Sequence, residues 1–420
     1  MKYSIWTFGC QMNESDSQRI ATILEKQNYK PVRRDEEADL IIVNACSVRQ
    51  SAIDRIYGKV KYFNQLKIKN SKLKIILTGC VLDQDKEKMA EIFDQIIDIS
   101  KINKLPVLLD SKIKIDKNLE NYFHIKPKYE SKIEAYVPIM TGCNNFCSYC
   151  VVPYTRGREI SRPASEIINE ITNLVKNGYK KITLLGQNVN SYKNKEIDFL
   201  NLIKLINNIP GNFWFSFLTN HPKDMSDELI MVLPNLEKFC HCVHLPLQSG
   251  NNKILKEMNR HYTCSQYLSL VQKIRKALPD VSLSTDIIVG FPGETKKQFS
   301  DTVGIIKKAK FDMAYIAGYS PRSQTTAYKL KDNVPREEKI KRQKALNQIL
   351  AKTALSNNKK YIGKVIEALV KGKSKKKGML YGETKTLKNL EFKSNKNIVG
   401  KFVKIKITKV ASWSIYGELV

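Results

Sequence analysis

Short apolar runs alternate with stretches of helical periodicity from Tyr3 to Phe93. The short runs are rich in β-branched and aromatic residues and predict strands, whereas apolar residues that recur every three or four positions predict helices. The predicted strands and helices follow one another in the order Tyr3–Phe8, Ser15–Asn28, Leu40–Val43, Ser47–Leu66, Leu73–Thr78 and Gln84–Phe93. Such alternation indicates a parallel sheet. The Lys-rich, weakly periodic residues 101–133 are interpreted as a linker.

A second alternating series begins at Ala135, with helical stretches such as Ala164–Asn177 and Gln266–Ala277 between its strands. Six strands are predicted: Ala135–Ile139, Lys181–Leu185, Phe213–Phe217, Cys242–Leu247, Ser282–Val289 and Met313–Tyr319. Six βα units are too few for a complete eight-fold barrel, so an open, partial (β/α)6 barrel is expected. Pro335–Tyr361 predicts one long helix, with Pro335 suited to its first turn.

The pattern changes after Ile362, where short β-type runs are separated by turn residues. The runs are Val365–Val370, Met379–Tyr381, Leu390–Phe392, Phe402–Ile407 and Trp413–Tyr416. They predict a small β-barrel of OB-like type. Residues 361–420 contain 14 Lys and 4 Glu but no Arg or Asp, a net charge of +10. The whole chain is therefore expected to be an α/β protein that ends in a basic β-barrel.

The amino-acid composition excludes some classes of protein and favours others. Hydrophobic residues make up 42% of the 420 residues, which excludes a wholly disordered chain. The 71 Lys and Arg exceed the 41 Asp and Glu, and a net charge of +30 points to a polyanion, either nucleic acid or an anionic membrane surface. Biased codon usage would also enrich lysine, but the excess charge is present either way.

The cellular location and the state of the cysteines follow from other features. No apolar run approaches the roughly 18 residues that cross a bilayer. The first residues contain no secretory signal, so a cytosolic location is expected. Nine cysteines in that compartment are not expected to form disulfides, and the odd number favours metal or cluster ligation.

The strongest local motif is the CxxxCxxC loop of Cys143, Cys147 and Cys150. Three thiolates on a tight turn suit one face of an iron–sulfur cubane and leave one iron open to chelate a small molecule through an amine and a carboxylate. The loop follows the first strand of the barrel series, at the end where such barrels place their sites. A structural zinc site is the alternative, but zinc prefers four closed ligands and no fourth Cys or His lies close by in sequence.

A second trio, Cys10, Cys46 and Cys80, is widely spaced in sequence, yet each cysteine ends a predicted strand of the first domain. Because parallel strands point their carboxyl ends to one edge, the three thiols are expected to converge there. Helix N-termini at that edge would favour thiolates. A second three-cysteine cluster is therefore predicted. The alternative is three buried apolar cysteines, which leaves the shared strand-end placement unexplained.

The remaining cysteines carry a weaker signal. Cys240, Cys242 and His244 look metal-like, but Cys242 and His244 share one face of a predicted strand simply because strands have a period of two. Cys264 begins a predicted helix. All three cysteines are interpreted as packing residues, with His244 at the mouth of the barrel.

These motifs together resemble radical S-adenosylmethionine (SAM) enzymes, and the whole chain resembles their methylthiotransferase family. Beyond the CxxxCxxC loop, the resemblance rests on six segments: Gly9–Asn13, Cys46–Arg49, Cys150–Glu159, Leu185–Tyr192, His244–Gly250 and Ser284–Glu294. It implies an N-terminal methylthiotransferase domain over residues 1–117, a radical-SAM core over 129–358 and an RNA-binding TRAM domain over 361–420.

The resemblance also implies site residues. Cys143, Cys147 and Cys150 would hold the [4Fe-4S] cluster that cleaves SAM, and Cys10, Cys46 and Cys80 would hold an auxiliary [4Fe-4S] cluster. Residues near SAM would be Tyr149, Gly186, Gln187, Asp286 and Ile288. Beyond the cluster ligands, no catalytic side chain is identified.

The implied reaction places a methylthio group on C2 of N6-dimethylallyladenosine in a tRNA anticodon loop. One SAM would supply the methyl group and a second the 5′-deoxyadenosyl radical. A monomer is expected, with an electron donor and a sulfur donor as further partners. The alternatives are sister enzymes that act on N6-threonylcarbamoyladenosine in tRNA or on an aspartate of a ribosomal protein, and a non-catalytic iron–sulfur RNA-binding protein. Gln11–Asn13 and Ser47–Arg49 favour the prenyl-adenosine enzyme over its sisters.

Overall fold

The computed structural model of the chain describes residues 1–48, 50–110 and 122–420. Arg49 and the expected domain boundary at residue 117 lie outside the described residues. The chain divides into two compact units. The first comprises Met1–Glu130, Met140–Arg162 and Arg322–Tyr328, and the second comprises Ser131–Ile139, Pro163–Pro321 and Lys329–Val420. In the part of the chain that is described, no helix is both long and apolar enough to span a membrane.

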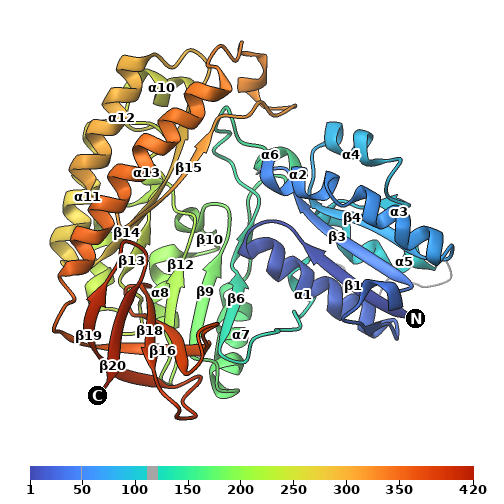
Figure 1. Ribbon diagram of the computed structural model, residues 1–420, viewed down its shortest axis with the longest axis horizontal. Helices are drawn as coiled ribbons and strands as arrows, with labels where there is room; N and C mark the ends of the chain where they lie inside the picture. Colours follow the sequence, from blue (N-terminus) through green and yellow to red (C-terminus); the bar gives the residue numbers. More distant parts are fainter. Residues whose placement is uncertain (49, 111–121) are drawn as a thin grey trace. The chain divides into compact units, whose positions relative to one another are not determined.

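The first unit is built on a five-stranded parallel sheet with the order β2-β1-β3-β4-β5 (Figure 1). Its strands are β1 Lys2–Thr7, β2 Lys30–Pro31, β3 Leu40–Cys46, β4 Lys74–Cys80 and β5 Gln95–Ile96. The central strand β3 is buried along its whole length, as expected for a parallel strand covered on both faces. The predicted parallel sheet is therefore confirmed.

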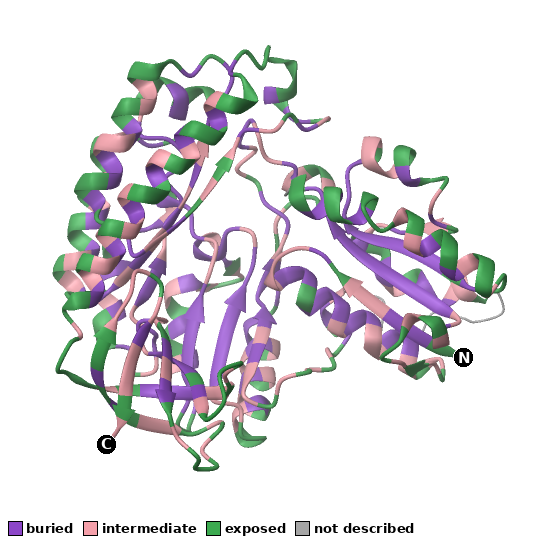
Figure 2. Cartoon of the chain, in the orientation of Figure 1, coloured by how far each residue is buried: buried purple, intermediate pink, exposed green. Residues whose placement is uncertain are grey.

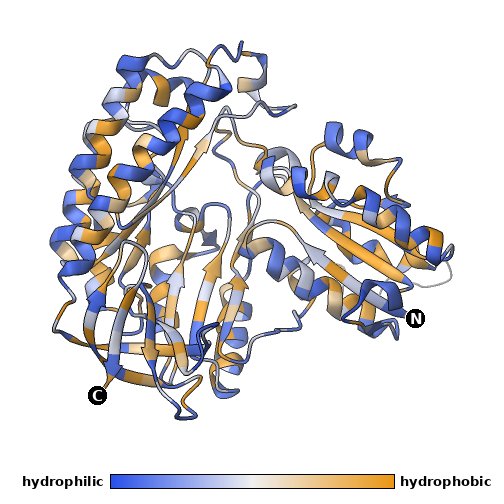
Figure 3. Ribbon diagram, viewed as in Figure 1, coloured by the Kyte–Doolittle hydropathy of each residue, from blue (hydrophilic) through white to orange (hydrophobic). Residues whose placement is uncertain are grey.

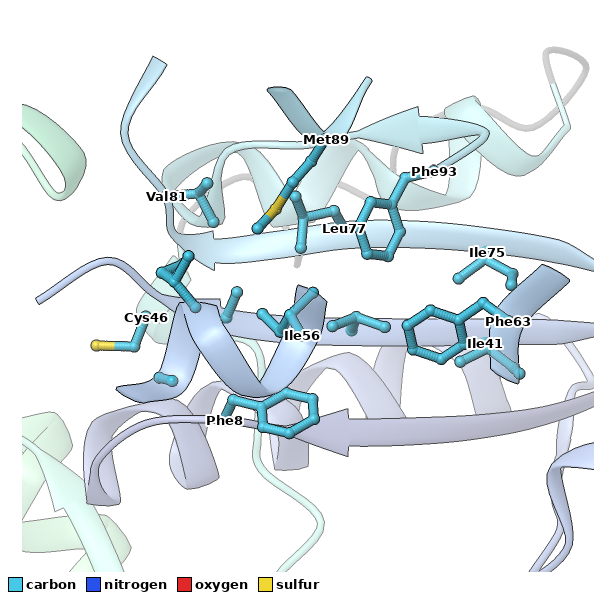
Figure 4. Packing of buried hydrophobic residues seen from close by; sticks show 14 of the residues in the cluster. Phe8, Ile41, Cys46, Ile56, Phe63, Ile75, Leu77, Val81, Met89 and Phe93 are labelled. Atoms are coloured by element: carbon cyan, nitrogen blue, oxygen red, sulfur yellow. The ribbon is translucent and has the colours of Figure 1, made fainter. Parts of the chain in front are cut away.

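Helices cover both faces of this sheet: α1 Gln11–Lys26, α2 Gln50–Tyr57, α3 Val60–Lys69, α4 Asp83–Met89 and α5 Leu105–Leu109. Ile20, Ile23 and Leu24 of α1 pack on one face, as their helical spacing predicts. Ile56 of α2 and Phe63 of α3 pack on the other face (Figure 4). The prediction of a single helix over Ser47–Leu66 is wrong. The helix is interrupted between Tyr57 and Val60, because Gly58 disfavours helical backbone there.

The linker interpretation of residues 101–133 is wrong for much of the described part of that stretch. A 3-10 helix over Ile99–Lys104, helix α5 and a 3-10 helix over Tyr122–His124 follow one another there. Ile102, Leu105 and Ile125 are buried in the same core as α1. The lysines on either side of Ile102, Lys101 and Lys104, are exposed and form only the solvated side of a packed segment.

The first unit also includes two segments distant in sequence from its sheet. Residues 140–162 carry the CxxxCxxC loop on a small antiparallel hairpin of β7 Met140–Thr141 and β8 Ile160–Ser161, with the short helix α6 Val152–Thr155 between them. In residues 322–328, the backbone N–H of Ala327 donates to the carbonyl of Ser148 at 2.7 Å.

The second unit contains the six parallel strands of the predicted barrel series, in two three-stranded sheets ordered β12-β9-β6 and β13-β14-β15. They are β6 Glu134–Pro138, β9 Lys181–Leu185, β12 Trp214–Phe217, β13 Cys242–His244, β14 Ser282–Val289 and β15 Met313–Gly318. β9 and β12 are buried throughout, and Figures 2 and 3 show the buried, apolar character of these strands.

The second unit contains seven α-helices among the described residues, and all but the last lie between these strands in sequence: α7 Ala164–Lys176, α8 Phe199–Asn207, α9 Asp227–Val232, α10 Asn252–Glu257, α11 Cys264–Ala277, α12 Lys296–Ala309 and α13 Arg336–Lys359. The short strands β10 Lys193–Asn194 and β11 Ile197–Asp198 form a separate antiparallel pair. Helix α13 is the long helix expected after the barrel series, and Pro335 is its N-cap residue.

Residues beyond α13 form a closed five-stranded barrel with the order β16-β17-β18-β20-β19. Its strands are β16 Val365–Lys373, β17 Met379–Thr384, β18 Asn389–Lys393, β19 Phe402–Val410 and β20 Ile415–Leu419. The interior contains Phe392, Ile405 and other apolar residues, whereas Tyr381 and Trp413 are substantially exposed. The α/β fold with a small C-terminal barrel is thus confirmed.

The C-terminal barrel packs within the second unit against the amino ends of the parallel strands. Lys181, the first residue of β9, forms a buried ion pair with Glu383 of β17 at 2.5 Å. The Trp214 ring lies 4.7 Å, centroid to centroid, from the Phe402 ring. These contacts tie the C-terminal barrel to the parallel sheets.

Candidate functional site

The first cysteine trio lies at one edge of the first unit's sheet. Cys46 and Cys80 are the last residues of β3 and β4 and stand opposite each other in the ladder. Cys10 follows the neighbouring strand β1 by three residues and is the N-cap residue of α1. In Figure 4 the sulfur of Cys46 points away from the other labelled residues of the apolar cluster, at the end of its strand. The convergence expected from strand ends is therefore present.

Two buried asparagines fix α1 against these strand ends. Asn13 donates from Nδ2 to the Oδ1 atom of Asn44 and to the carbonyl of Ala45, each at 2.9 Å. Asn44 donates in return to the carbonyl of Asn13 at 2.8 Å. Since Asn13 follows Cys10 by three residues and Asn44 precedes Cys46 by two, this network sets the position of both sulfur atoms.

Gly79 permits the close approach of β4 to β3 immediately before Cys80. Its φ of +111° is one that L side chains rarely adopt, and a Cβ atom there would overlap the backbone of Ala45. Any larger residue would therefore displace Cys80 from its place opposite Cys46.

The thiols of this trio influence one another. A hydrogen bond between Cys46 and Cys80 lowers the pKa of Cys46 and raises that of Cys80. Burial raises the pKa of Cys10, whereas Arg156 and the backbone N–H groups of Asn13 and Met12 act in the opposite direction. The N–H groups come from the first turn of α1, where a helix favours negative charge.

The second trio lies on the CxxxCxxC loop, which belongs to the same compact unit. Cys143 and Cys147 are buried, and Cys150 is partly exposed. The backbone N–H of Cys150 donates to the carbonyl of Cys147 at 2.9 Å, which closes the tight turn that the spacing predicts. Burial raises the pKa of the Cys143 thiol, and the backbone N–H of Asn145 opposes this effect.

Arg156, six residues after Cys150, joins the two parts of the unit that carry the trios. Its Nε atom donates to Cys80 Sγ at 2.9 Å, and its Nη2 atom pairs with Asp16 of α1 at 2.5 Å. The Arg156 and Asp16 side chains are 3% and 0% exposed. Burial by itself lowers the pKa of Arg156, but the Asp16 carboxylate, Cys80 and Tyr122 together outweigh it, so the pKa is raised and the guanidinium stays charged.

The chemistry of these residues fits iron–sulfur ligation. Every cysteine is a free thiol, and soft thiolates are the ligands that such clusters use. Among the described residues, no group of three His, Cys, Asp or Glu side chains is gathered closely enough to hold a single metal ion. A cubane is larger than one ion and carries its ligands on separate irons, so its thiolates stand further apart. Backbone N–H donors at Cys10, Cys46 and Cys143 add the hydrogen bonds that cluster sulfurs and thiolates accept.

Of the other three cysteines, Cys240 and Cys242 are buried as expected of packing residues, whereas Cys264 is only partly buried. Cys240 and Cys242 are buried with Trp214 and Leu369 in one apolar cluster. Burial raises the pKa of Cys242 to about 12 and that of Cys264 to about 11. Such thiols stay protonated at neutral pH and are poor ligands.

The residues expected near SAM fall in both units. Tyr149 lies on the CxxxCxxC loop of the first unit, whereas Gly186 and Gln187 follow β9 in the second. Asp286 and Ile288 share the less buried face of β14. On that face His244 makes hydrogen bonds to Ser284 at 2.9 Å and to Asp286 at 3.2 Å, which places His244 beside an expected SAM residue.

Sequence reasoning missed several polar residues around these sites. Asp16 and Arg156 are separated by 140 residues, so no local pattern reveals their ion pair. In the second unit, Oδ1 of Asn188 and Oδ1 of Asn220 are buried without a hydrogen-bond partner, as is Oε1 of Gln187, which was expected near SAM from the sequence. A signal existed for Asn188, because it follows the end of the predicted strand Lys181–Leu185 by three residues.

Three family models match separate parts of the chain. Residues 2–99 match the Uncharacterized protein family UPF0004, residues 137–306 match the Radical SAM superfamily, and residues 359–420 match the TRAM domain. The six cysteines of the two trios fall within the first two of these matches, three in each.

Solved structures share the fold. The radical S-adenosylmethionine methyltransferase TsrM from Kitasatospora setae, with tryptophan and a SAM analogue bound, aligns with a TM-score of 0.55 at 13% identity and covers 75% of this chain and 72% of that one. The cobalamin-dependent radical enzyme OxsB aligns with a TM-score of 0.54 at 10% identity and covers 86% of this chain and 56% of that one. At these identities the likeness concerns the fold alone.

Curated relatives match the whole chain. A tRNA-2-methylthio-N(6)-dimethylallyladenosine synthase from Clostridium novyi (strain NT) is 45% identical over 441 residues, which cover 100% of this chain and 96% of that protein. The protein of the same name from Caldicellulosiruptor saccharolyticus is 43% identical and covers 100% of this chain and 92% of its own length. With its radical SAM and TRAM matches, the chain belongs to the tRNA-2-methylthio-N(6)-dimethylallyladenosine synthases, a family of radical SAM enzymes.

Proposed function

We propose that this enzyme transfers a methylthio group to C2 of N6-dimethylallyladenosine in tRNA. The observation that carries the proposal is the match over the whole chain to enzymes named for that product. The names of these relatives do not favour the threonylcarbamoyl-adenosine enzyme or a non-catalytic RNA-binding protein.

Six cysteines are proposed as ligands of two [4Fe-4S] clusters. Cys10, Cys46 and Cys80 hold one at the sheet edge, and Cys143, Cys147 and Cys150 hold the other on the loop. When bound, the clusters and SAM supply the radical that removes the C2 hydrogen and the methylthio group that replaces it. Support comes from the presence of both trios in one compact unit, which keeps the two ligand sets on a common scaffold.

The protein's own task in this reaction is to hold the clusters and SAM in place and to shield them from water. Asn13 and Asn44 fix the first trio, and the Cys147–Cys150 turn fixes the second. Tyr149, Gly186, Gln187, Asp286 and Ile288 are proposed to contact SAM. The face of β14 that carries Asp286 and Ile288 is partly exposed, as a strand that meets a ligand requires.

The C-terminal barrel is proposed to bind the tRNA backbone. It carries a net charge of +10, and Lys373, Lys375 and Lys377 are exposed at the turn between β16 and β17. Exposed lysines attract phosphates and release counterions on binding. The proposal also includes three domains, over residues 1–117, 129–358 and 361–420. It further includes a monomeric state, a cytosolic location, and an electron donor and a sulfur donor as partners.

Anaerobic turnover on three tRNAs tests the proposal, with the adenosine plain, prenylated or threonylcarbamoylated and the nucleosides identified by mass spectrometry. Burial of the prenyl carbons gains on the order of 0.8 kcal/mol per CH₂-sized group. A carboxylate in the same apolar space would pay a large desolvation cost. The prenylated tRNA should therefore react far faster. Preference for the threonylcarbamoylated tRNA would contradict the substrate assignment and leave the two-cluster chemistry in place.

A further inference from the structure

A buried cation in direct contact with a proposed cluster ligand stands out among the polar groups of the first unit. Arg156 Nε donates to Cys80 Sγ at 2.9 Å, and the Arg156 side chain is only 3% exposed, so solvent screens its charge little. The same guanidinium pairs with Asp16 at 2.5 Å. Tyr122 donates from its hydroxyl to the other carboxylate oxygen of Asp16 at 2.6 Å and so holds the pair in place.

The charges of Arg156 and Asp16 both act on a cluster bound at Cys80. Reduction of an iron–sulfur cluster by one electron adds one negative charge, and hydrogen bonds to its sulfurs and the net charge nearby set its potential. A charge-assisted N–H···S bond stabilises the more negative, reduced state. The Asp16 carboxylate, also fully buried, offsets part of the positive charge of Arg156.

We infer that Arg156 is a positioning residue that raises the reduction potential of the cluster held by Cys10, Cys46 and Cys80, and that Asp16 moderates this effect. The inference rests on the proposed ligation of that cluster. It gives Arg156 a role that a purely structural ion pair lacks: removal of either partner would destabilise the fold alike, but the two removals shift the potential in opposite directions.

The test uses the full chain carrying Cys143→Ala, Cys147→Ala and Cys150→Ala, so that the auxiliary cluster alone remains after anaerobic reconstitution with ferrous iron and sulfide. Midpoint potentials are measured in a mediated spectroelectrochemical titration, with iron content determined on the same samples. Arg156→Gln should lower the potential by an amount equal to a tenfold or larger change in the reduction equilibrium, about 59 mV for one electron. Asp16→Asn should raise it.

Two further variants guard against simple unfolding. The double variant Arg156→Gln/Asp16→Asn leaves no unpaired charge buried, and its potential should lie between those of the single variants. Arg158→Gln is the matched control, because Arg158 is exposed and its guanidinium stacks on the Phe146 ring, 4.3 Å from the ring centroid. This variant should leave the potential unchanged.

Shifts of opposite sign at full iron content would establish the inference. An unchanged potential in Arg156→Gln, or shifts of the same sign in both single variants, would overturn it while leaving the proposed ligation intact. A background protein that retains no iron would contradict the ligation itself, and the inference with it.

Discussion

Individual polar side chains, rather than the cysteines alone, give the candidate site its geometry. Asn13 and Asn44 exchange hydrogen bonds between the start of α1 and the end of β3, and Gly79 allows β4 to reach the same edge. The cysteines themselves could be predicted from sequence, because strand ends and the CxxxCxxC spacing are local patterns. Arg156 and Asp16 could not, since their contact depends on how distant segments fold together.

The buried side chain of His221 makes the stability of the folded enzyme depend on pH. His221 is 3% exposed, its Nδ1 atom accepts from the backbone N–H of Lys223, and its Nε2 atom is buried without a partner. Burial, with help from nearby Arg260 and Lys223, lowers its pKa to about 2. The folded state therefore holds this ring neutral, whereas the unfolded chain protonates it below a pH of about 6.5.

The stability of the enzyme should consequently fall as the pH drops below about 6.5, because the unfolded state then binds a proton that the folded state refuses. Between pH 7 and pH 5, His221 should lower the free energy of unfolding by about 2 kcal/mol. His221→Gln should show a shallower decline in denaturant unfolding measured at pH 5, 6 and 7. Exposed His124→Gln is the control and should keep the wild-type slope. Equal slopes in all three proteins would refute the assignment.

At the scale of elements, the strands of the barrel series and of the C-terminal barrel were predicted more accurately than the helices of the first unit. All six strands of the barrel series and all five of the C-terminal barrel were recognised, because a buried strand is a short apolar run with clear ends. The helix predicted over Ser47–Leu66 is two helices, and residues 101–133 are not a mere linker. In the second case, abundant lysine concealed the buried Ile102, Leu105 and Ile125.

A buried ion pair connects two such elements, β9 and β17. Lys181 and Glu383 lie 2.5 Å apart and are 8% and 9% exposed. Lys181→Met would leave the Glu383 carboxylate without this partner and should destabilise the enzyme by about 3–5 kcal/mol. The double variant Lys181→Met/Glu383→Met should recover most of that loss, as measured by thermal unfolding.

Lys273→Met is the comparison for this prediction. Lys273 pairs with Asp227 at 2.7 Å, but both side chains are about half exposed or more. Loss of this exposed ion pair should lower the free energy of unfolding by no more than about 1 kcal/mol. A Lys181→Met effect as small as that of Lys273→Met would show that the C-terminal barrel does not depend on the buried pair.

At the scale of the whole molecule, sequence order does not coincide with compactness. The CxxxCxxC loop follows the first barrel strand in sequence, yet residues 140–162 belong to the unit that contains the first trio. No local pattern predicts this assignment, because it depends on contacts such as those of Arg156 with Asp16 and Cys80. The overall α/β class and the separate C-terminal barrel, in contrast, follow from periodicity and length.

The basic C-terminal barrel should account for much of the affinity for RNA. Changing the exposed Lys373, Lys375 and Lys377 to Gln should weaken tRNA binding and reduce the slope of log affinity against log salt by up to about 2. Filter binding or anisotropy across a salt series measures both. The matched control changes three exposed lysines of α12, Lys297, Lys307 and Lys308. Equal effects from the two triple variants would indicate that net charge alone, and not this barrel, attracts the RNA.

The central claim is that two separate cysteine trios each hold one cluster, and the iron content of three reconstituted proteins tests it most directly. The wild-type chain should contain roughly eight irons, two cubanes in all. Replacement of Cys10, Cys46 and Cys80 by Ala, or of Cys143, Cys147 and Cys150 by Ala, should each leave about half of that iron. Full iron retention in either triple variant would contradict the account.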